Sequence, residues 1–159
     1  MQKIKHFFKS QKTKIIWVVV TLLLGGLGAL LAGNFDVYES YEKPPLSPPA
    51  ILFPIVWTLL YILIGIAAGI VADSRDVDRT SALKLYCLQL LVNIIWPIIF
   101  FRFEALRFAL FWLLLLLLTV AVTIKSFFRI TKLSAYLMIP YFVWCLFAFY
   151  LNFGIVVLN

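Results

Sequence analysis

Five long apolar stretches fill most of this 159-residue chain, and none of them contains a lysine, arginine, aspartate, glutamate or histidine. Each stretch has close to the roughly 20 apolar residues that a helix needs to cross the hydrocarbon core of a bilayer. The stretches therefore predict five transmembrane helices. In the sequence they run over Ile15–Asn34, Ala50–Ala72, Leu85–Phe101, Phe108–Ile124 and Leu133–Leu158.

The composition indicates that lipid is the solvent for most of the surface. Hydrophobic residues make up 64% of the chain, whereas soluble domains have roughly 45–50%. The length allows one bundle and no separate soluble domain, and short links join antiparallel neighbours. We expect an all-α polytopic membrane protein, a single domain over residues 1–159 with five transmembrane helices in an up-and-down bundle. The helices are predicted at about 15–34, 50–72, 82–101, 105–126 and 133–158.

Basic residues are concentrated on one predicted face of the membrane. Alternate links place three clusters together, within residues 3–14, 75–84 and 125–132, whereas the other face has only Lys43, Arg102 and Arg107. This distribution assigns the net charge of +7 to a membrane surface, with lipid and not nucleic acid as the partner. By the positive-inside rule, the N-terminus is cytoplasmic and the C-terminus external. We expect an integral multi-pass protein of a bacterial cell membrane.

The connection over residues 35–49, the lid segment, is the longest link between the predicted helices. Four of its last six residues are prolines. Proline fixes φ and removes a backbone donor, so this part is expected to be stiff and non-helical. Two interpretations remain open, a lid over the mouth of the bundle and a simple spacer.

Small residues recur at helical spacing in the first two predicted helices. Gly25, Ala29 and Gly33 share one face, and Gly65 and Gly69 repeat the pattern. Such faces let helices approach closely in lipid. They are typical both of packing within a bundle and of a dimer seam, and the sequence leaves the two uses open.

The sequence lacks the signatures of metal, nucleotide and hydrolase sites. There is no glycine-rich phosphate loop, and the single histidine, His6, lies in the basic N-terminal tail. We expect no metal and no cofactor. Ion and proton pumps usually keep an ionisable residue inside the membrane, so charge-free spans favour an apolar, flat ligand over ion translocation.

Aromatic and amide side chains share faces of three predicted helices. Such a set suits a large planar molecule, which stacks on tryptophan and tyrosine while an amide fixes its orientation. Two other interpretations remain open, tryptophans at the membrane interface and an Asn93 hydrogen bond between helices. The set comprises Trp57 and Tyr61 in the second helix, Gln89, Asn93, Trp96 and Phe100 in the third, and Tyr141, Trp144, Phe147, Ala148 and Leu151 in the fifth.

Four ordered motifs carry a resemblance to a known family over about residues 34–159. They are KPPLSPP at residues 43–49, FPIVWTLLY at 53–61, QLLVNIIWP at 89–97 and PYFVWCLFAFYLN at 140–152. In this order, within a chain of five spans, they resemble the tryptophan-rich sensory protein family, also called the translocator protein or TspO/MBR family.

The resemblance implies a five-helix membrane bundle, commonly a homodimer, with a pocket among the helices beneath the first loop. It implies binding of porphyrins such as protoporphyrin IX, and of benzodiazepine-site drugs. Some bacterial members are reported to degrade protoporphyrin in light, and Trp57 and Trp144 match the tryptophans concerned. Carried over by position, the ligand-binding residues are Pro44, Pro45, Trp57, Tyr61, Asn93, Trp96, Phe100, Phe108, Trp144, Phe147, Ala148 and Leu151.

The chain departs from the family pattern in its first loop and its last helix. Leu46 stands where the loop usually carries a tryptophan, and Val37 replaces a second. Both changes thin the aromatic lid. In addition, no basic residue follows Tyr150, so the cholesterol-recognition pattern of animal members is broken. Sterol is therefore disfavoured as a ligand.

Three functions follow from these features. The first is binding of a porphyrin or related tetrapyrrole, for sensing, buffering or transport. The second is light- and oxygen-dependent breakdown of that porphyrin, with Trp57 and Trp144 as electron donors. The third is a structural or regulatory membrane partner whose pocket is vestigial, with the small-residue faces serving protein contacts.

Overall fold

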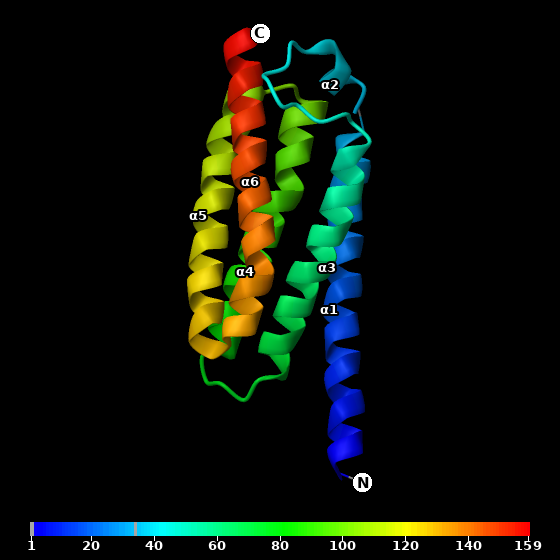
Figure 1. Ribbon diagram of the computed structural model, residues 1–159, viewed down its shortest axis with the longest axis vertical. Coiled ribbons are helices and arrows are strands. Elements are labelled where there is room, and N and C mark those ends of the chain that lie inside the picture. The colour runs from blue at the N-terminus through cyan, green and yellow to red at the C-terminus, as the bar shows by residue number, and fades with distance from the viewer. Residues whose placement is uncertain (1, 34) are drawn as a thin grey trace.

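The computed structural model describes residues 2–33 and 35–159, with side chains described from Gln11 onward apart from that of Asn34. It is a bundle of long helices with the termini at opposite ends (Figure 1). Five of the described helices are long and apolar enough to cross a membrane. The elements are α1 (Gln2–Ala32), α2 (Val37–Ser40), α3 (Leu52–Asp73), α4 (Arg79–Pro97), the π-helical turn η1 (Ile98–Arg102), α5 (Leu106–Ile130) and α6 (Lys132–Leu158).

The observed helices extend beyond the apolar stretches that predicted them. Helix α1 begins at Gln2, within the basic tail, and α5 continues through Lys125 and Arg129 to Ile130. Hydropathy marks only the part of a helix that suits hydrocarbon, whereas backbone hydrogen bonding continues into the polar ends. Asn34, the last residue of the first predicted helix, lies outside the described residues.

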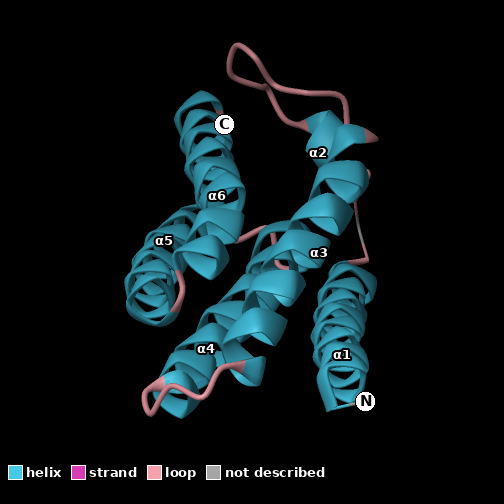
Figure 2. Ribbon diagram, turned by 60° about the horizontal axis from the view of Figure 1, so that its bottom comes forward, coloured by secondary structure: helices cyan, strands magenta, loops and turns pink. Residues whose placement is uncertain are grey.

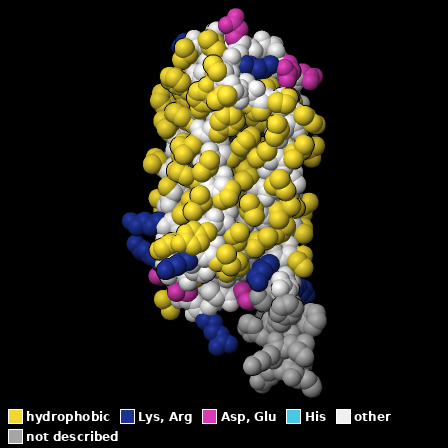
Figure 3. Space-filling model, viewed as in Figure 1, with side chains coloured by type: hydrophobic (Ala, Val, Ile, Leu, Met, Phe, Trp, Pro, Cys, Tyr) yellow, Lys and Arg dark blue, Asp and Glu magenta, His cyan; other side chains and the backbone are white. Residues whose placement is uncertain are grey.

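The all-α, five-helix prediction is confirmed, and alternate links lie at the same end of the bundle. Helix α1 lies at one side, against α3 and α4, and α5 lies at the other side, against α4 and α6 (Figure 2). Figure 3 shows apolar side chains along the length of one face. On that face most of the visible lysine and arginine side chains gather near the N-terminal end. This surface fits a lipid environment.

Glycines bring α1 into backbone contact with α3. A Cβ atom on Gly65 would lie 2.7 Å from the Cα of Val18, and one on Gly69 would lie 2.6 Å from the Cα of Lys14. No real Cβ tolerates such distances, so only glycine permits this approach. Of the two uses that the sequence leaves open for these residues, the structure shows packing within the bundle.

Helix α4 shares a side-chain hydrogen bond with every other long helix. In lipid, a polar side chain that is buried without a partner is unfavourable, and these bonds pair the polar groups of neighbouring helices. The four bonds are Thr21 Oγ1 with the Tyr86 hydroxyl at 2.6 Å, Tyr61 to Asn93 Oδ1 at 2.7 Å, Trp112 to the Val92 carbonyl at 2.8 Å and Tyr141 to Gln89 Oε1 at 2.9 Å.

The glycine contact predicts opposite effects for the same substitution at two positions. Gly65→Ala forces α1 and α3 apart, and overpacking of this kind costs about 1–3 kcal/mol. Gly26 has open space around it, so Gly26→Ala gains about 1 kcal/mol of helix propensity without a clash. We expect a lower midpoint of thermal unfolding in detergent for Gly65→Ala and an equal or higher one for Gly26→Ala. Equal shifts for both variants would contradict the packing described here.

Candidate functional site

A cavity of about 440 Å³ lies between α1, α3 and α4 at the end of the bundle covered by the lid segment. Its volume is within the range of small-molecule sites, roughly 300–1,000 Å³. The walls are mainly aromatic and small apolar residues, with one amide. They comprise Gly25, Ala29, Phe35, Tyr38, Ala50, Ile51, Phe53, Pro54, Trp57, Tyr61, Asn93, Trp96, Pro97 and Phe101.

The floor of this cavity is formed by Gly25, Tyr61 and Asn93. Helices α1 and α4 run toward the lid end and α3 runs away from it, so these are the deepest lining residues of their helices. A Cβ on Gly25 would collide with the Tyr61 ring. The glycine therefore makes room for the ring that closes the floor.

The Tyr61–Asn93 hydrogen bond determines which polar group the floor offers. The Tyr61 hydroxyl donates to Asn93 Oδ1 at 2.7 Å. Asn93 is only 1% exposed, and its Nδ2 donates to none of the described residues. Since the amide oxygen is engaged, the side chain offers N–H donors to a ligand. Such a floor favours a ligand that carries a hydrogen-bond acceptor.

Trp57 and Trp96 supply large flat surfaces on opposite helices of the cavity. The Trp57 ring lies 5.5 Å from the Tyr61 ring and 6.1 Å from the Tyr141 ring, measured between centroids. Trp96 lies 5.4 Å from Phe100. These contacts hold the two indoles in place, as a stacking site for a planar molecule requires.

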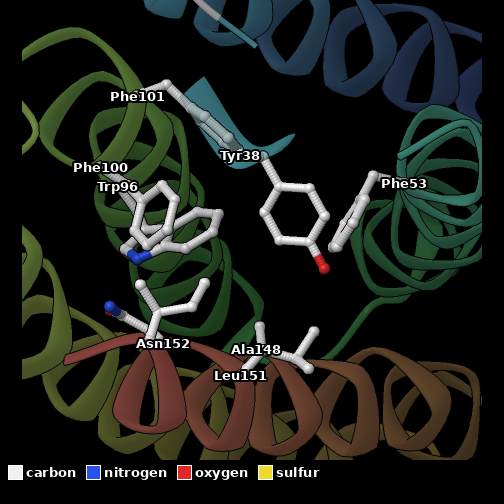
Figure 4. Close-up of a pocket in the computed structure, with 9 residues that line it drawn as sticks. Tyr38, Phe53, Trp96, Phe100, Phe101, Ala148, Leu151 and Asn152 are labelled. Atoms are coloured by element: carbon white, nitrogen blue, oxygen red, sulfur yellow. The ribbon is translucent and has the colours of Figure 1, made fainter. Parts of the chain in front are cut away.

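A second cavity of about 20 Å³ adjoins the first on the side of α6. Helix α6 contributes Ala148, Leu151, Asn152 and Ile155 to it (Figure 4). The two cavities share four aromatic side chains as walls, which are Tyr38, Phe53, Trp96 and Phe101. The site is thus divided by aromatic rings into a large compartment and a small one.

The end of α4 shapes the wall that the two cavities share. Pro97 has no N–H with which to continue the helical ladder, and the five residues after it form the π-helical turn η1. Such turns widen the helix and recur at functional sites. Here the turn places Phe100 against the small cavity and Phe101 against both.

The second half of the lid segment is attached to α6. Glu42 N donates to Asn159 Oδ1, and Asn159 Nδ2 donates to the Glu42 carbonyl, both at 3.1 Å. The Tyr150 hydroxyl donates to the Pro45 carbonyl at 2.8 Å. Gly154 leaves room for the Pro44 ring, which a Cβ would strike. These contacts hold the prolines across the end of the bundle.

Tyrosines on the lid segment make further contacts below it. The Tyr41 hydroxyl donates to Glu104 Oε2 at 3.3 Å, beside the link between η1 and α5. The Tyr38 hydroxyl donates to the Pro48 carbonyl at 3.4 Å. Burial raises the pKa of Tyr38 above its usual value of 10.0, so its phenol is neutral and able to donate at physiological pH.

The structure brings most of the predicted ligand residues to the two cavities. Those that line a cavity are Trp57, Tyr61, Asn93, Trp96, Phe100, Ala148 and Leu151. They divide between the compartments, because only Trp96 of this set faces both. Their spacing along single helices predicted the faces that the structure turns inward.

Five of the predicted ligand residues line neither cavity. Pro44 and Pro45 attach the lid segment to α6. Phe108 is 55% exposed on α5. Trp144 packs between Phe53 and Phe147, with ring centroids 6.1 and 5.4 Å away. Phe53, which lines both cavities, is thus in contact with Trp144, although Trp144 itself lines neither.

The contributions of α1 and of the lid tyrosine to the site did not follow from the sequence. For Gly25 and Ala29 the sequence leaves open packing within the bundle and a dimer seam, whereas in the structure both residues also line the large cavity. Tyr38 follows Val37, where the loss of a tryptophan had suggested a thinner aromatic lid. Its own ring faces the site instead.

Loss of the floor hydrogen bond is predicted to destabilise the bundle measurably. Tyr61→Phe leaves Asn93 Oδ1 without its donor, and interhelical bonds of this kind contribute about 0.5–2 kcal/mol in membranes. Tyr136→Phe is the control, because Tyr136 is exposed and its hydroxyl makes no hydrogen bond to the described residues. Unfolding free energies measured by denaturant titration in detergent should fall for the first variant alone. A fall of the same size in the control would contradict this role.

Comparison with known proteins agrees with this architecture. The model of the TspO/MBR family matches residues 16–158. Tryptophan-rich protein TspO of Chlorobaculum tepidum is 35% identical over 77% of this chain and 78% of its own length. Protein CrtK of Rhodobacter capsulatus is 34% identical over 91% of each chain, and the translocator protein of Bos taurus is 31% identical over 82% and 83%. The chain belongs to the TspO/MBR family.

Proposed function

We propose that this membrane protein binds a porphyrin or related tetrapyrrole, of the protoporphyrin IX type, beneath the lid segment, in a site that includes the large cavity. The observation that carries the proposal is the pairing of two tryptophan surfaces with one buried amide donor in a cavity of ligand size. Relatives named tryptophan-rich sensory protein and translocator protein fit a role in sensing or moving such a ligand.

The chemistry of the walls supports a flat apolar ligand that carries an acceptor. Trp57 and Trp96 offer ring faces for stacking, and the Asn93 amide offers N–H donors at the floor. A carbonyl or carboxyl oxygen on the ligand meets that donor. Benzodiazepine-site drugs share this combination of rings and acceptors, so we propose that the same cavity accepts them.

We place the lid segment on the external side of a bacterial cell membrane. The basic clusters at the opposite end of the bundle support this orientation through the positive-inside rule. Ile51 at the rim of the cavity is exposed, as is Phe35. An apolar ligand therefore reaches the cavity beside an apolar rim at the outer end of the bundle.

A titration with protoporphyrin IX tests the proposed site. Trp57→Leu removes a stacking surface worth about 0.5–1.5 kcal/mol, which corresponds to roughly a two- to tenfold weaker affinity. Trp144→Leu is the matched control, because Trp144 lines neither cavity. Binding is followed by the shift of the porphyrin absorption band in detergent.

Two results of this titration would contradict the proposal. If Trp144→Leu weakens binding as much as Trp57→Leu does, the ligand does not lie in the large cavity. If the unaltered protein binds no tetrapyrrole at all, the proposed function fails and the alternative of a regulatory membrane partner takes its place.

Light-dependent breakdown of the bound porphyrin is the second candidate function. One observation favours it: Trp57 and Tyr61 line the large cavity, and the Trp57 ring also contacts the ring of Tyr141, so that oxidisable rings lead from the cavity wall into the bundle. The complex is illuminated in the presence of oxygen while its Soret band is followed. For a catalyst, we expect the band to bleach faster than in Trp57→Phe at equal porphyrin occupancy. Equal bleaching rates would reject catalysis through this residue.

A further inference from the structure

The Tyr38 ring lies between the two compartments of the site. It borders both cavities and is only 4% exposed. Figure 4 shows the ring entering from α2, with Trp96 on one side, Phe53 on the other and Ala148 and Leu151 of α6 facing it. Of the rings that both cavities share, Tyr38 alone comes from the lid segment.

The Tyr38 side chain is held by one long hydrogen bond and by ring contacts with Phe53 and Lys43. Its hydroxyl donates to the Pro48 carbonyl at 3.4 Å, beyond the usual range for such bonds. Helix α2 is a single turn of four residues whose N-cap makes no side-chain hydrogen bond. The ring packs edge-to-face against Phe53, at 5.1 Å between centroids, and the Lys43 ammonium lies 4.9 Å from the centroid of the Tyr38 ring.

The turn that carries Tyr38 lies between a glycine on the α1 side and the part of the lid segment that is attached to α6. On the α1 side, Gly33 has a φ of +66°, a conformation that glycine adopts without strain. On the other side, the bonds of Glu42 and Pro45 attach the lid segment to α6. Movement of α2 about Gly33 can therefore withdraw the ring while the prolines stay in place.

We propose that Tyr38 is a displaceable plug that sets the size of ligand the site accepts. With the ring in place, the ligand is confined to the compartment between α1, α3 and α4, which suits two or three fused rings. With the ring withdrawn, the compartments join and reach Ala148 and Leu151, which suits a macrocycle. The assignment of ligands rests on the proposed function, whereas the plug itself is a property of the chain.

Cysteine labelling tests the plug without any tetrapyrrole. Ala148→Cys places a thiol in the small cavity, and the native Cys87, which is exposed, gives an internal reference. Labelling by a small apolar maleimide is measured at each cysteine by peptide mass spectrometry. Three forms carrying Ala148→Cys are compared, with Tyr38 intact, with Tyr38→Phe and with Tyr38→Ala.

We expect the ratio of labelling at position 148 to labelling at Cys87 to be higher in Tyr38→Ala than in the form with Tyr38 intact. The increase should reach up to about tenfold, because the free energy of one aromatic contact corresponds to a factor of about that size. Tyr38→Phe keeps the ring and its contact with Phe53, so its ratio should stay near that of the intact form. Equal labelling ratios in all three forms would show that the Tyr38 ring does not restrict access to the small cavity, and would contradict the proposal. This outcome does not depend on whether the protein binds porphyrin.

The proposed effect of Tyr38 on ligand size is tested by titrating the intact protein and Tyr38→Ala with two probes, protoporphyrin IX and the three-ring ketone anthraquinone. Removal of the plug should strengthen binding of the porphyrin several-fold and leave the anthraquinone affinity unchanged or weaker. Weaker porphyrin binding by Tyr38→Ala would show that the Tyr38 side chain contacts the ligand, and would contradict the proposal that it limits ligand size. Absence of porphyrin binding in every form would refute the proposed function. The labelling ratio would still show whether the Tyr38 ring restricts access to the small cavity.

Discussion

The side-chain hydrogen bonds between the long helices of this bundle converge on α4. Each of the other long helices bonds to it through one side chain, and the bonds of Tyr86, Gln89, Val92 and Asn93 lie along one helix. The last of these, from Tyr61 to Asn93, is also the floor of the large cavity. The hydrogen bond that joins α3 to α4 thus leaves one amide with N–H groups free for a ligand.

Much of the fold follows from the sequence because lipid constrains it strongly. Charge-free stretches of spanning length permit few structures, and the five helices lie where those stretches predict them. The inward faces of α3 and α4 also follow, because Trp57 and Tyr61, like Asn93 and Trp96, recur at helical spacing. Helical periodicity selects a face from local information alone, so these residues could be identified without the structure.

The remaining features of the site depend on how neighbouring helices fill the space between them. Trp144 is on the same helix as Ala148, but it packs against the Phe53 ring and lines neither cavity. Periodicity along α6 carries no information about a ring that arrives from α3. The same limit applies to Tyr38, because the backbone course of the lid segment determines where that ring points. Division of the site into two compartments is therefore a tertiary property.

Whether a planar ligand occupies the space beneath the lid segment can be decided by a structure of the complex with protoporphyrin IX. We expect a macrocycle stacked beside Trp57 and Trp96, an oxygen of the ligand near Asn93 Nδ2, and the Tyr38 ring withdrawn from its place beside Phe53. A macrocycle bound on the outer surface of the helices, with both cavities unchanged, would show that the ligand does not bind beneath the lid segment.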